Sequence, residues 1–191
     1  LLGCAASTSD QPPGSDSALE RSIFREQDAR RSTGDETIPA QSEAQYLFMR
    51  GELAFAQENF DEALDFYRQA ANTDPTPAPF LRKRLAQLYV RRQELELALK
   101  ELELAERGSP NDLQIIELRA GVLATLKRSD EAIASYRKLI QLSGTPPNEE
   151  AYILLASLLA DSGQLPEAKK TLEELLAKSP NSLFGHYYLA R

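Results

Sequence analysis

The stretch Gly51–Pro75, GELAFAQENFDEALDFYRQAANTDP, decides the fold, because its pattern returns three more times downstream. The small residue at its centre recurs at intervals of 34 to 36 residues, as Ala63, Ala98, Ala132 and Ala168. A fixed period of this length is typical of a helical solenoid, in which each repeat buries its apolar face against the next.

Other positions agree in the same register. The small residues twelve positions before each of these alanines are Gly51, Ala86, Ala120 and Ala156. The residues four and seven positions after it are Tyr67, Leu102, Tyr136 and Leu172, then Ala70, Ala105, Leu139 and Leu175. Small residues let two helices approach closely, and large ones fill the space beside them. The helix breakers twelve positions after it are Pro75, Pro110, Gly144 and Pro180. Each copy is therefore predicted to be a helix, a tight turn, a second helix and a stop.

The helix ends give further expectations. Asn59, Ser129 and Asp130 are suitable N-cap residues, since their side chains can accept a hydrogen bond from a free backbone N–H group. Gly163 stands in the turn inside the fourth copy, where a positive φ is easily accepted.

These copies resemble the tetratricopeptide repeat, a 34-residue helical hairpin with a small residue at position eight, Ala at twenty, a large residue at twenty-four and Pro at thirty-two. The resemblance covers copies 44–77, 79–112, 113–146 and 149–182, and residues 183–191 resemble one helix of a fifth copy. It implies an all-α, right-handed α-solenoid of stacked helix-turn-helix hairpins over residues 43–191. Arg50 and Arg119 replace a usual apolar residue, so we expect both to swing outward or to snorkel, with the charged end reaching polar surroundings. The apolar last helix suggests that more repeats or another domain follow Arg191.

The amino-terminal residues differ in composition from these repeats. Residues 1–4, Leu-Leu-Gly-Cys, resemble the lipobox of bacterial lipoproteins, which implies acyl chains such as palmitate on Cys4 and a mature protein that begins there. In such lipoproteins, Ala5 after the cysteine points to the outer membrane. The alternative is an incidental free thiol. The absence of a basic start and an apolar core before Cys4 suggests that the sequence begins partway through a precursor.

Residues 5–42 are rich in Ser, Asp, Gln and Pro and have few large apolar side chains, so they are predicted to be a disordered tether. Within it, Ser17 and Glu20 form a possible capping box for a short helix that extends to Phe24.

Composition excludes several functions. The net charge of −7 argues against binding to nucleic acid, and one His and one Cys exclude both a Cys/His metal cluster and an intrachain disulfide. His186 is expected to be a packing residue, because no cysteine lies near it to act as a nucleophile. No glycine-rich phosphate loop is present, so the sequence predicts a non-enzymatic protein without a cofactor.

The resemblance also implies a concave groove, lined by positions two, five, nine, twelve and thirteen of each copy. The positions most expected to contact a partner are Phe48, Glu52, Phe55, Lys83, Gln87, Arg91, Glu117, Gly121, Ile153 and Ser157. The remaining positions are Gln45, Ala56, Phe80, Val90, Gln114, Ala124, Thr125, Glu150, Ala160 and Asp161. Apolar anchors with a few charges suit an extended peptide or a helix. The chaperone-binding subclass clamps a carboxylate with Lys and Asn where this chain has Phe48 and Glu52, so that subclass is not expected.

These observations lead to one main hypothesis and two alternatives. The main hypothesis is a non-catalytic protein-binding scaffold, anchored by lipid to the bacterial outer membrane and facing the periplasm. It would assist assembly of an envelope machine such as a pilus, a secretin, an outer-membrane protein or an exopolysaccharide exporter. The first alternative is a substrate-docking arm of an enzyme whose catalytic domain lies beyond Arg191. The second is self-association through the last helix.

Overall fold

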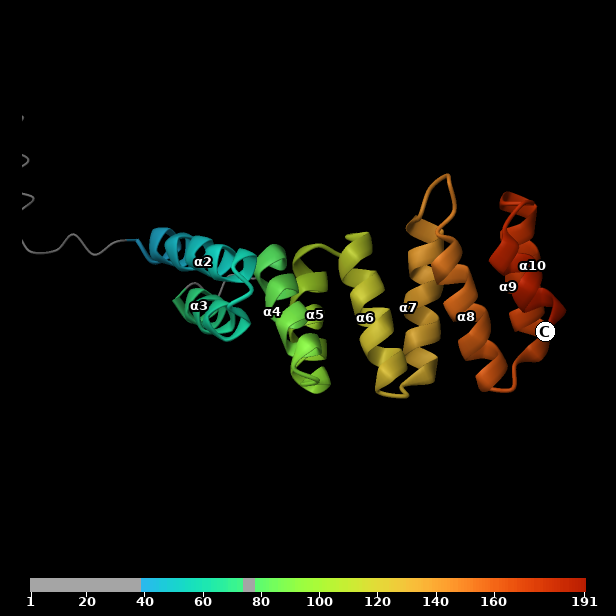
Figure 1. The fold of residues 1–191 in the computed structure, drawn as a ribbon, viewed down its shortest axis with the longest axis horizontal. Coiled ribbons are helices and arrows are strands. Elements are labelled where there is room, and N and C mark those ends of the chain that lie inside the picture. The colour runs from blue at the N-terminus through green and yellow to red at the C-terminus, as the bar shows by residue number, and fades with distance from the viewer. Residues whose placement is uncertain (1–38, 74–77) are drawn as a thin grey trace, which may run out of the picture. The chain divides into compact units, whose positions relative to one another are not determined.

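The computed structural model describes residues 39–73 and 78–191, and within these ranges every regular element is a helix (Figure 1). The predicted lipobox, Cys4, the short helix after Ser17 and the tether up to residue 38 lie outside the described residues. The helices are α2 (Ala40–Ala56), α3 (Phe60–Thr73), α4 (Pro79–Arg91), α5 (Leu95–Gly108), α6 (Leu113–Thr125), α7 (Ser129–Leu142), α8 (Glu149–Asp161), α9 (Leu165–Lys178) and α10 (Leu183–Ala190).

Consecutive helices form hairpins, and the hairpins follow one another in a row from α2 to α10 (Figure 1). The pairs are α2 with α3, α4 with α5, α6 with α7, and α8 with α9, which confirms the four predicted hairpins. Helix α2 begins directly after Pro39, before residue 43, where the repeat domain is predicted to start. The last helix, α10, packs on α9 and exposes Leu183, Phe184 and Tyr187.

The predicted core positions are all buried. Apart from Gly51, which is also buried, none of the residues predicted at the small and large core positions is more than 6% exposed. Side chains from neighbouring hairpins share the same core clusters, so each hairpin is covered by the next. Burial of a large apolar side chain contributes about 1.5–3 kcal/mol. The period found in the sequence is therefore the period of the packing.

A close approach explains the glycine in the first copy. A Cβ atom built on Gly51 would overlap the aromatic ring of Tyr67, which lies opposite it on α3. The equivalent positions in the other copies carry alanine, as Ala86, Ala120 and Ala156. The position that Tyr67 holds in the first copy is held by Leu102, Tyr136 and Leu172 in the others. Leu102 and Leu172 are smaller than Tyr67, whereas Tyr136 is another tyrosine.

The turn inside each hairpin has one repeated backbone geometry. Glu58, Gln93, Lys127 and Gly163 have φ values of 61°, 62°, 60° and 77°. In each turn the N–H group of the next residue donates to a carbonyl five residues back, as from Arg128 to Leu123 at 2.9 Å. This pattern is the Schellman motif, which ends a helix with one residue in the left-handed region. The positive φ predicted for Gly163 is confirmed, and three residues with side chains adopt it as well.

Lys127→Gly is expected to stabilise the protein by about 0.5–1 kcal/mol, because glycine avoids the steric cost that a side chain has at positive φ. Lys127 is exposed, so little packing is lost. Urea unfolding followed by circular dichroism measures the change. Gly163→Ala, at the equivalent position, should lower stability by a similar amount, and a lower urea midpoint for Lys127→Gly would contradict the explanation.

Side-chain caps lie at the start of the first helices α6 and α8, whereas the second helices α5, α7 and α9 have none. Asp112 accepts hydrogen bonds from the N–H groups of Gln114 and Ile115 at 2.9 and 3.2 Å, and Asn148 accepts one from Ala151 at 3.0 Å. The caps predicted at Ser129 and Asp130 are wrong, since α7 begins at Ser129 and its N-cap residue is Arg128. The tight turn leads straight into α7, so both residues already belong to its first turn.

The two arginines at usual apolar positions behave differently. Arg50 points outward as predicted, and its guanidinium lies over the ring of Phe66 at 4.4 Å. Arg119 does not, because α5 and α7 provide polar partners: its Nη1 donates to Ser135 at 2.9 Å and its Nε lies 3.6 Å from Glu106. Arg119 is therefore half-buried beside α5 and α7 and does not swing outward as Arg50 does.

Candidate protein-binding face

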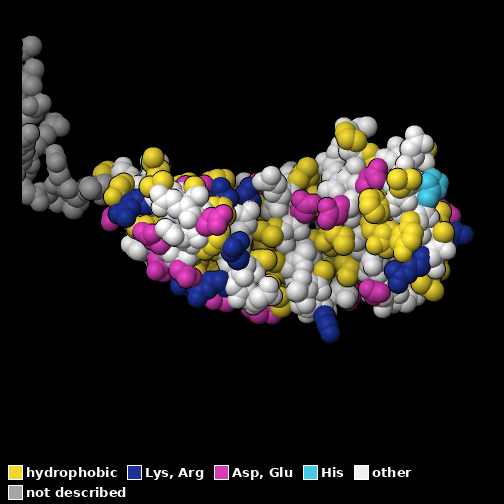
Figure 2. All heavy atoms as spheres, viewed as in Figure 1, with side chains coloured by type: hydrophobic (Ala, Val, Ile, Leu, Met, Phe, Trp, Pro, Cys, Tyr) yellow, Lys and Arg dark blue, Asp and Glu magenta, His cyan; other side chains and the backbone are white. Residues whose placement is uncertain are grey.

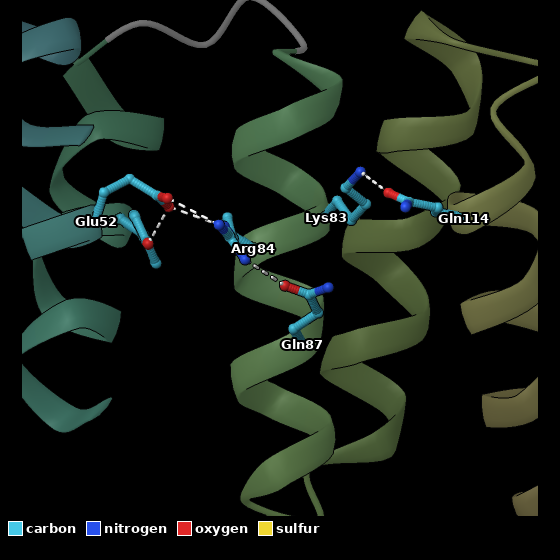
Figure 3. Close-up of polar contacts among 6 residues, drawn as sticks. Glu52, Lys83, Arg84, Gln87 and Gln114 are labelled. Atoms are coloured by element: carbon cyan, nitrogen blue, oxygen red, sulfur yellow. Dashed lines mark hydrogen bonds and ion pairs between the residues drawn. The ribbon is translucent and has the colours of Figure 1, made fainter. Parts of the chain in front are cut away.

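The predicted groove residues lie on α2, α4, α6 and α8, the first helices of the four hairpins. We call the surface formed by their side chains the first-helix face. Helix α4 links its neighbours, since Arg84 points toward Glu52 on α2 and Lys83 toward Gln114 on α6 (Figure 3). In the one view of the molecule shown in Figure 2, acidic and basic side chains are scattered among apolar ones and form no large patch of one sign.

An apolar cavity opens at the amino-terminal end of this face. The rings of Phe48 and Phe80 meet edge to face with their centroids 5.3 Å apart, and Phe48 also lies 5.6 Å from Tyr67. Phe80 is 48% exposed, which is high for an aromatic side chain. The cavity has a volume of about 210 Å³ and is lined by Gln41, Ala44, Gln45, Phe48, Ala70, Ala78, Phe80 and Leu81. Its size and lining suit one apolar side chain of a partner.

Glu52 is held by its own chain. Its two carboxylate oxygens accept hydrogen bonds from Nε and Nη2 of Arg84, each at 2.8 Å, and it also accepts one from the hydroxyl of Tyr67. Burial, reinforced by this hydrogen bond, raises the pKa of Tyr67 above its usual range. Arg84 Nη1 donates to Gln87 at 3.2 Å (Figure 3). Glu52 and Gln87, both predicted as partner contacts, therefore also hold Arg84 in place within the chain.

The sequence prediction missed Arg84, although a signal for it exists. Facing residues of adjacent hairpins stand 31 or 32 residues apart, as Glu52 and Arg84 do, and as Glu106 and Lys138 do. Opposite charges at this interval therefore indicate ion pairs between repeats.

Arg84→Ala is expected to lower stability by about 1–3 kcal/mol, because it leaves the half-buried carboxylate of Glu52 without its bidentate partner. Chemical unfolding in urea measures the loss. Arg92→Ala is the matched control, since Arg92 is 45% exposed and forms only surface ion pairs, with Asp61 at 3.7 Å and with Glu94 at 3.2 Å. That control should change stability by less than about 0.5 kcal/mol. Equal losses for the two variants would show that the Arg84 pair is not special.

Lys83 lies between α4 and α6 and is only 8% exposed. Its Nζ donates to Gln114 at 2.8 Å and lies 3.9 Å from Asp112 (Figure 3). A direct contact between Lys83 and a partner, as the sequence predicts, would require the hydrogen bond from Lys83 to Gln114 to break. Gln114 itself is exposed.

Arg91 is the exposed cation of this face. Its guanidinium stacks on the ring of Phe60 at 3.7 Å, and Phe60 in turn meets Phe55 edge to face at 5.4 Å. Stacking on an aromatic ring holds the side chain in place and leaves its N–H groups open to solvent.

The carboxyl-terminal half of the face is acidic. Glu117 and Glu150 are exposed, and Asn148 lies at the long distance of 3.5 Å from Glu117. Gly121, Ile153 and Ser157 are half-buried; a Cβ atom on Gly121 would meet open space. A second cavity of about 500 Å³ lies among residues of α8, α9 and the carboxyl-terminal segment, lined by Ala156, Ser157, Ala160, Asp161, Leu165, Ala168, Lys169, Leu172, Tyr188, Leu189 and Arg191.

His186 is exposed, so its predicted packing role is wrong. Its Nε2 donates to the backbone carbonyl of Pro180 at 2.9 Å, because a carbonyl can only accept. Across residues 39–73 and 78–191, no group of three or more His, Cys, Asp and Glu side chains gathers as a metal site would require. In the same ranges, no helix combines the length and the apolar character that a membrane span requires.

A row of stacked helical hairpins with an exposed first-helix face is typical of one class of protein, the α-solenoid scaffolds. Family models described as tetratricopeptide repeat match residues 44–77, 83–147 and 123–186, which together cover more than half of the chain. The chain belongs to the tetratricopeptide-repeat family. Repeats of this family are typically non-catalytic interaction modules, and the chain is a protein–protein interaction scaffold.

Solved structures share the fold. A structure of MamA matches with a TM-score of 0.68 and 15% identity, over 76% of this chain and 78% of that one. YrrB, described as a tetratricopeptide-repeat protein with an unusual peptide-binding site, matches with a TM-score of 0.64 and 19% identity, over 91% and 80%. The first repeat domain of Spaghetti (RPAP3), bound to an HSP90 peptide, matches with a TM-score of 0.57 and 25% identity, over 64% and 95%. A search of the curated proteins finds no significant match.

Proposed function

We propose that this scaffold holds a segment of a partner protein against its first-helix face. The observation that carries the proposal is the apolar cavity beside Phe48 and Phe80, with exposed charged side chains further along the same face. A partner side chain in the cavity would supply binding energy, and the charges would fix its register. The peptide-binding descriptions of YrrB and of the RPAP3 domain support the proposal.

The proposal also includes a location. Cys4 within Leu-Leu-Gly-Cys would carry the acyl chains of a lipoprotein, and Ala5 after it favours the outer membrane with the repeats facing the periplasm. There the scaffold would assist assembly of an envelope machine such as a pilus, a secretin, an outer-membrane protein or an exopolysaccharide exporter.

Crosslinking in cells tests the binding face. Wild-type protein is expected to capture partner proteins that Phe80→Ala combined with Arg91→Ala loses, because this double variant removes an exposed anchor and an exposed cation. Leu97→Ala combined with Arg107→Ala is the control, since both residues are exposed on the second helix α5. Both variants should keep wild-type circular dichroism. A set of captured proteins that the Phe80 and Arg91 variant leaves unchanged would overturn the proposal.

Labelling with radioactive palmitate tests the anchor separately. The full gene product is expected to take up label and to fractionate with the outer membrane, whereas Cys4→Ala should lose both. Equal labelling of Cys4→Ala would overturn the lipid anchor and leave the binding face unaffected.

A further inference from the structure

Equivalent junctions between consecutive first helices differ in chemistry. At the first two junctions, position five of one copy contacts position two of the next: Phe48 meets Phe80, and Lys83 meets Gln114. The same register pairs Glu117 with Glu150 at the third junction. The first pair is a contact between aromatic rings, and the second is a hydrogen bond of 2.8 Å. The face is therefore apolar at the first junction and acidic at the third. At the second junction, it has a lysine whose ammonium group is hydrogen-bonded to Gln114.

The third junction has two carboxylates with no cation between them. Asn148, the N-cap residue of α8, lies 3.5 Å from the Glu117 carboxylate, just as Asp112, the N-cap residue of α6, lies 3.9 Å from Lys83, so Glu117 faces the start of α8, where Glu150 stands. Burial raises the pKa of Tyr136, and the charges of Glu117 and Glu150 raise it further, as expected for two carboxylates on this side of the core. Within the described part of the chain, neither has a Lys or Arg within 4.0 Å. Glu101 and Glu106, by contrast, each have a basic partner. A cationic group brought in by a partner would be attracted by both carboxylates.

The middle junction contributes no free charge. Lys83 is buried and its Nζ is engaged by Gln114, whereas the amide of Gln114 is exposed and can hydrogen-bond a peptide backbone. The outer two junctions therefore determine which side chains are accepted.

The separation of these two junctions sets a length. Neighbouring packed helices lie about 8–10 Å apart, so two steps along the face span roughly 20 Å. An extended chain advances about 3.3 Å per residue, so this span corresponds to about six residues.

We propose that the first-helix face recognises an extended partner segment with a large apolar side chain and, about six residues away, a Lys or Arg. The apolar side chain would enter the cavity beside Phe48 and Phe80, and the basic group would lie between Glu117 and Glu150. This inference rests on the proposed function and adds the chemistry of the partner. The net charge of −7 favours association with a basic segment.

Selection from a library of random 12-residue peptides displayed on phage, with the full 191-residue protein as bait, tests the inference. Enriched peptides should pair an apolar residue with Lys or Arg at about this spacing. Their affinity, measured by fluorescence anisotropy, should fall about tenfold for Glu117→Gln combined with Glu150→Gln, and should fall with added salt. Glu173→Gln combined with Glu174→Gln, exposed residues of α9, should leave affinity unchanged.

Reversal of charge gives the sharpest result. Glu117→Lys combined with Glu150→Lys is expected to select peptides with Asp or Glu in place of the basic residue. Some peptides could lose affinity for Phe80→Ala yet bind the Gln and the Lys double variants of Glu117 and Glu150 as tightly as wild type. Such peptides would overturn the inference and leave the proposed function standing. Enrichment of peptides insensitive to all of these changes, or no enrichment, would overturn both.

Discussion

Gly51→Ala is expected to lower stability by about 3 kcal/mol, because the added Cβ atom would overlap the ring of Tyr67 across the α2–α3 hairpin. Tyr67 cannot move away freely. It is fully buried, its ring lies against Phe48, and its hydroxyl donates to Glu52. Since hairpins of a solenoid are stabilised by their neighbours, the damage should be largest in α2 and α3. Hydrogen exchange should show the largest loss of protection in these two helices.

Gly121→Ala provides a control of opposite sign. Gly121 also lies inside a first helix, but a Cβ atom there would have no neighbouring atom within 4 Å. Alanine is the better helix former by about 0.8–1.0 kcal/mol, so this variant should be more stable than wild type. Urea unfolding of both variants gives the comparison, and two changes of the same sign would contradict the role assigned to Tyr67.

The different roles of these two glycines show where sequence reasoning succeeds. Gly51 belongs to a set of buried positions that recur in every copy, because stacked hairpins require the same close approaches each time. Such a constraint leaves a period in the sequence, so the helices, hairpins and core positions are predictable. Gly121 faces open space, and no packing requirement determines which residue stands there.

The binding face follows no such constraint. Lys83 and Glu117 hold the same position in adjacent copies, yet Lys83 is buried and Glu117 is exposed. The difference arises from the next hairpin: Gln114 accepts a hydrogen bond of 2.8 Å from Lys83, whereas Asn148 reaches Glu117 only at 3.5 Å, and Glu150 in the paired position is also acidic. Whether a polar residue is available to a partner therefore depends on pairs about 32 residues apart.

Turns are predictable only in part for a similar reason. The Schellman geometry recurs at Glu58, Gln93 and Lys127, but only Gly163 shows it in the residue type. Hairpin packing holds the other three residues in the left-handed region, at a local cost that the sequence does not reveal.

Leu102→Ala is expected to lower stability by about 2–5 kcal/mol, the usual range for a leucine removed from a packed core. Leu102 is fully buried in α5, at the position held by Tyr67 in the first hairpin. The second hairpin joins α2 and α3 to the rest of the row, and its loss would uncouple them from the hairpins that follow. The unfolding transition in urea should therefore move to a lower midpoint and become broader.

Leu97→Ala in the same helix separates this packing effect from any change in helix propensity. Leu97 is 43% exposed, so its truncation should change stability by less than about 0.5 kcal/mol and leave the transition as steep as in wild type. A cavity at Leu102 acts on both neighbouring hairpins, because the core cluster that contains Leu102 includes residues of α3 and α6. A loss for Leu102→Ala no larger than for Leu97→Ala would mean that each hairpin is stable by itself, contrary to a solenoid stabilised by shared interfaces.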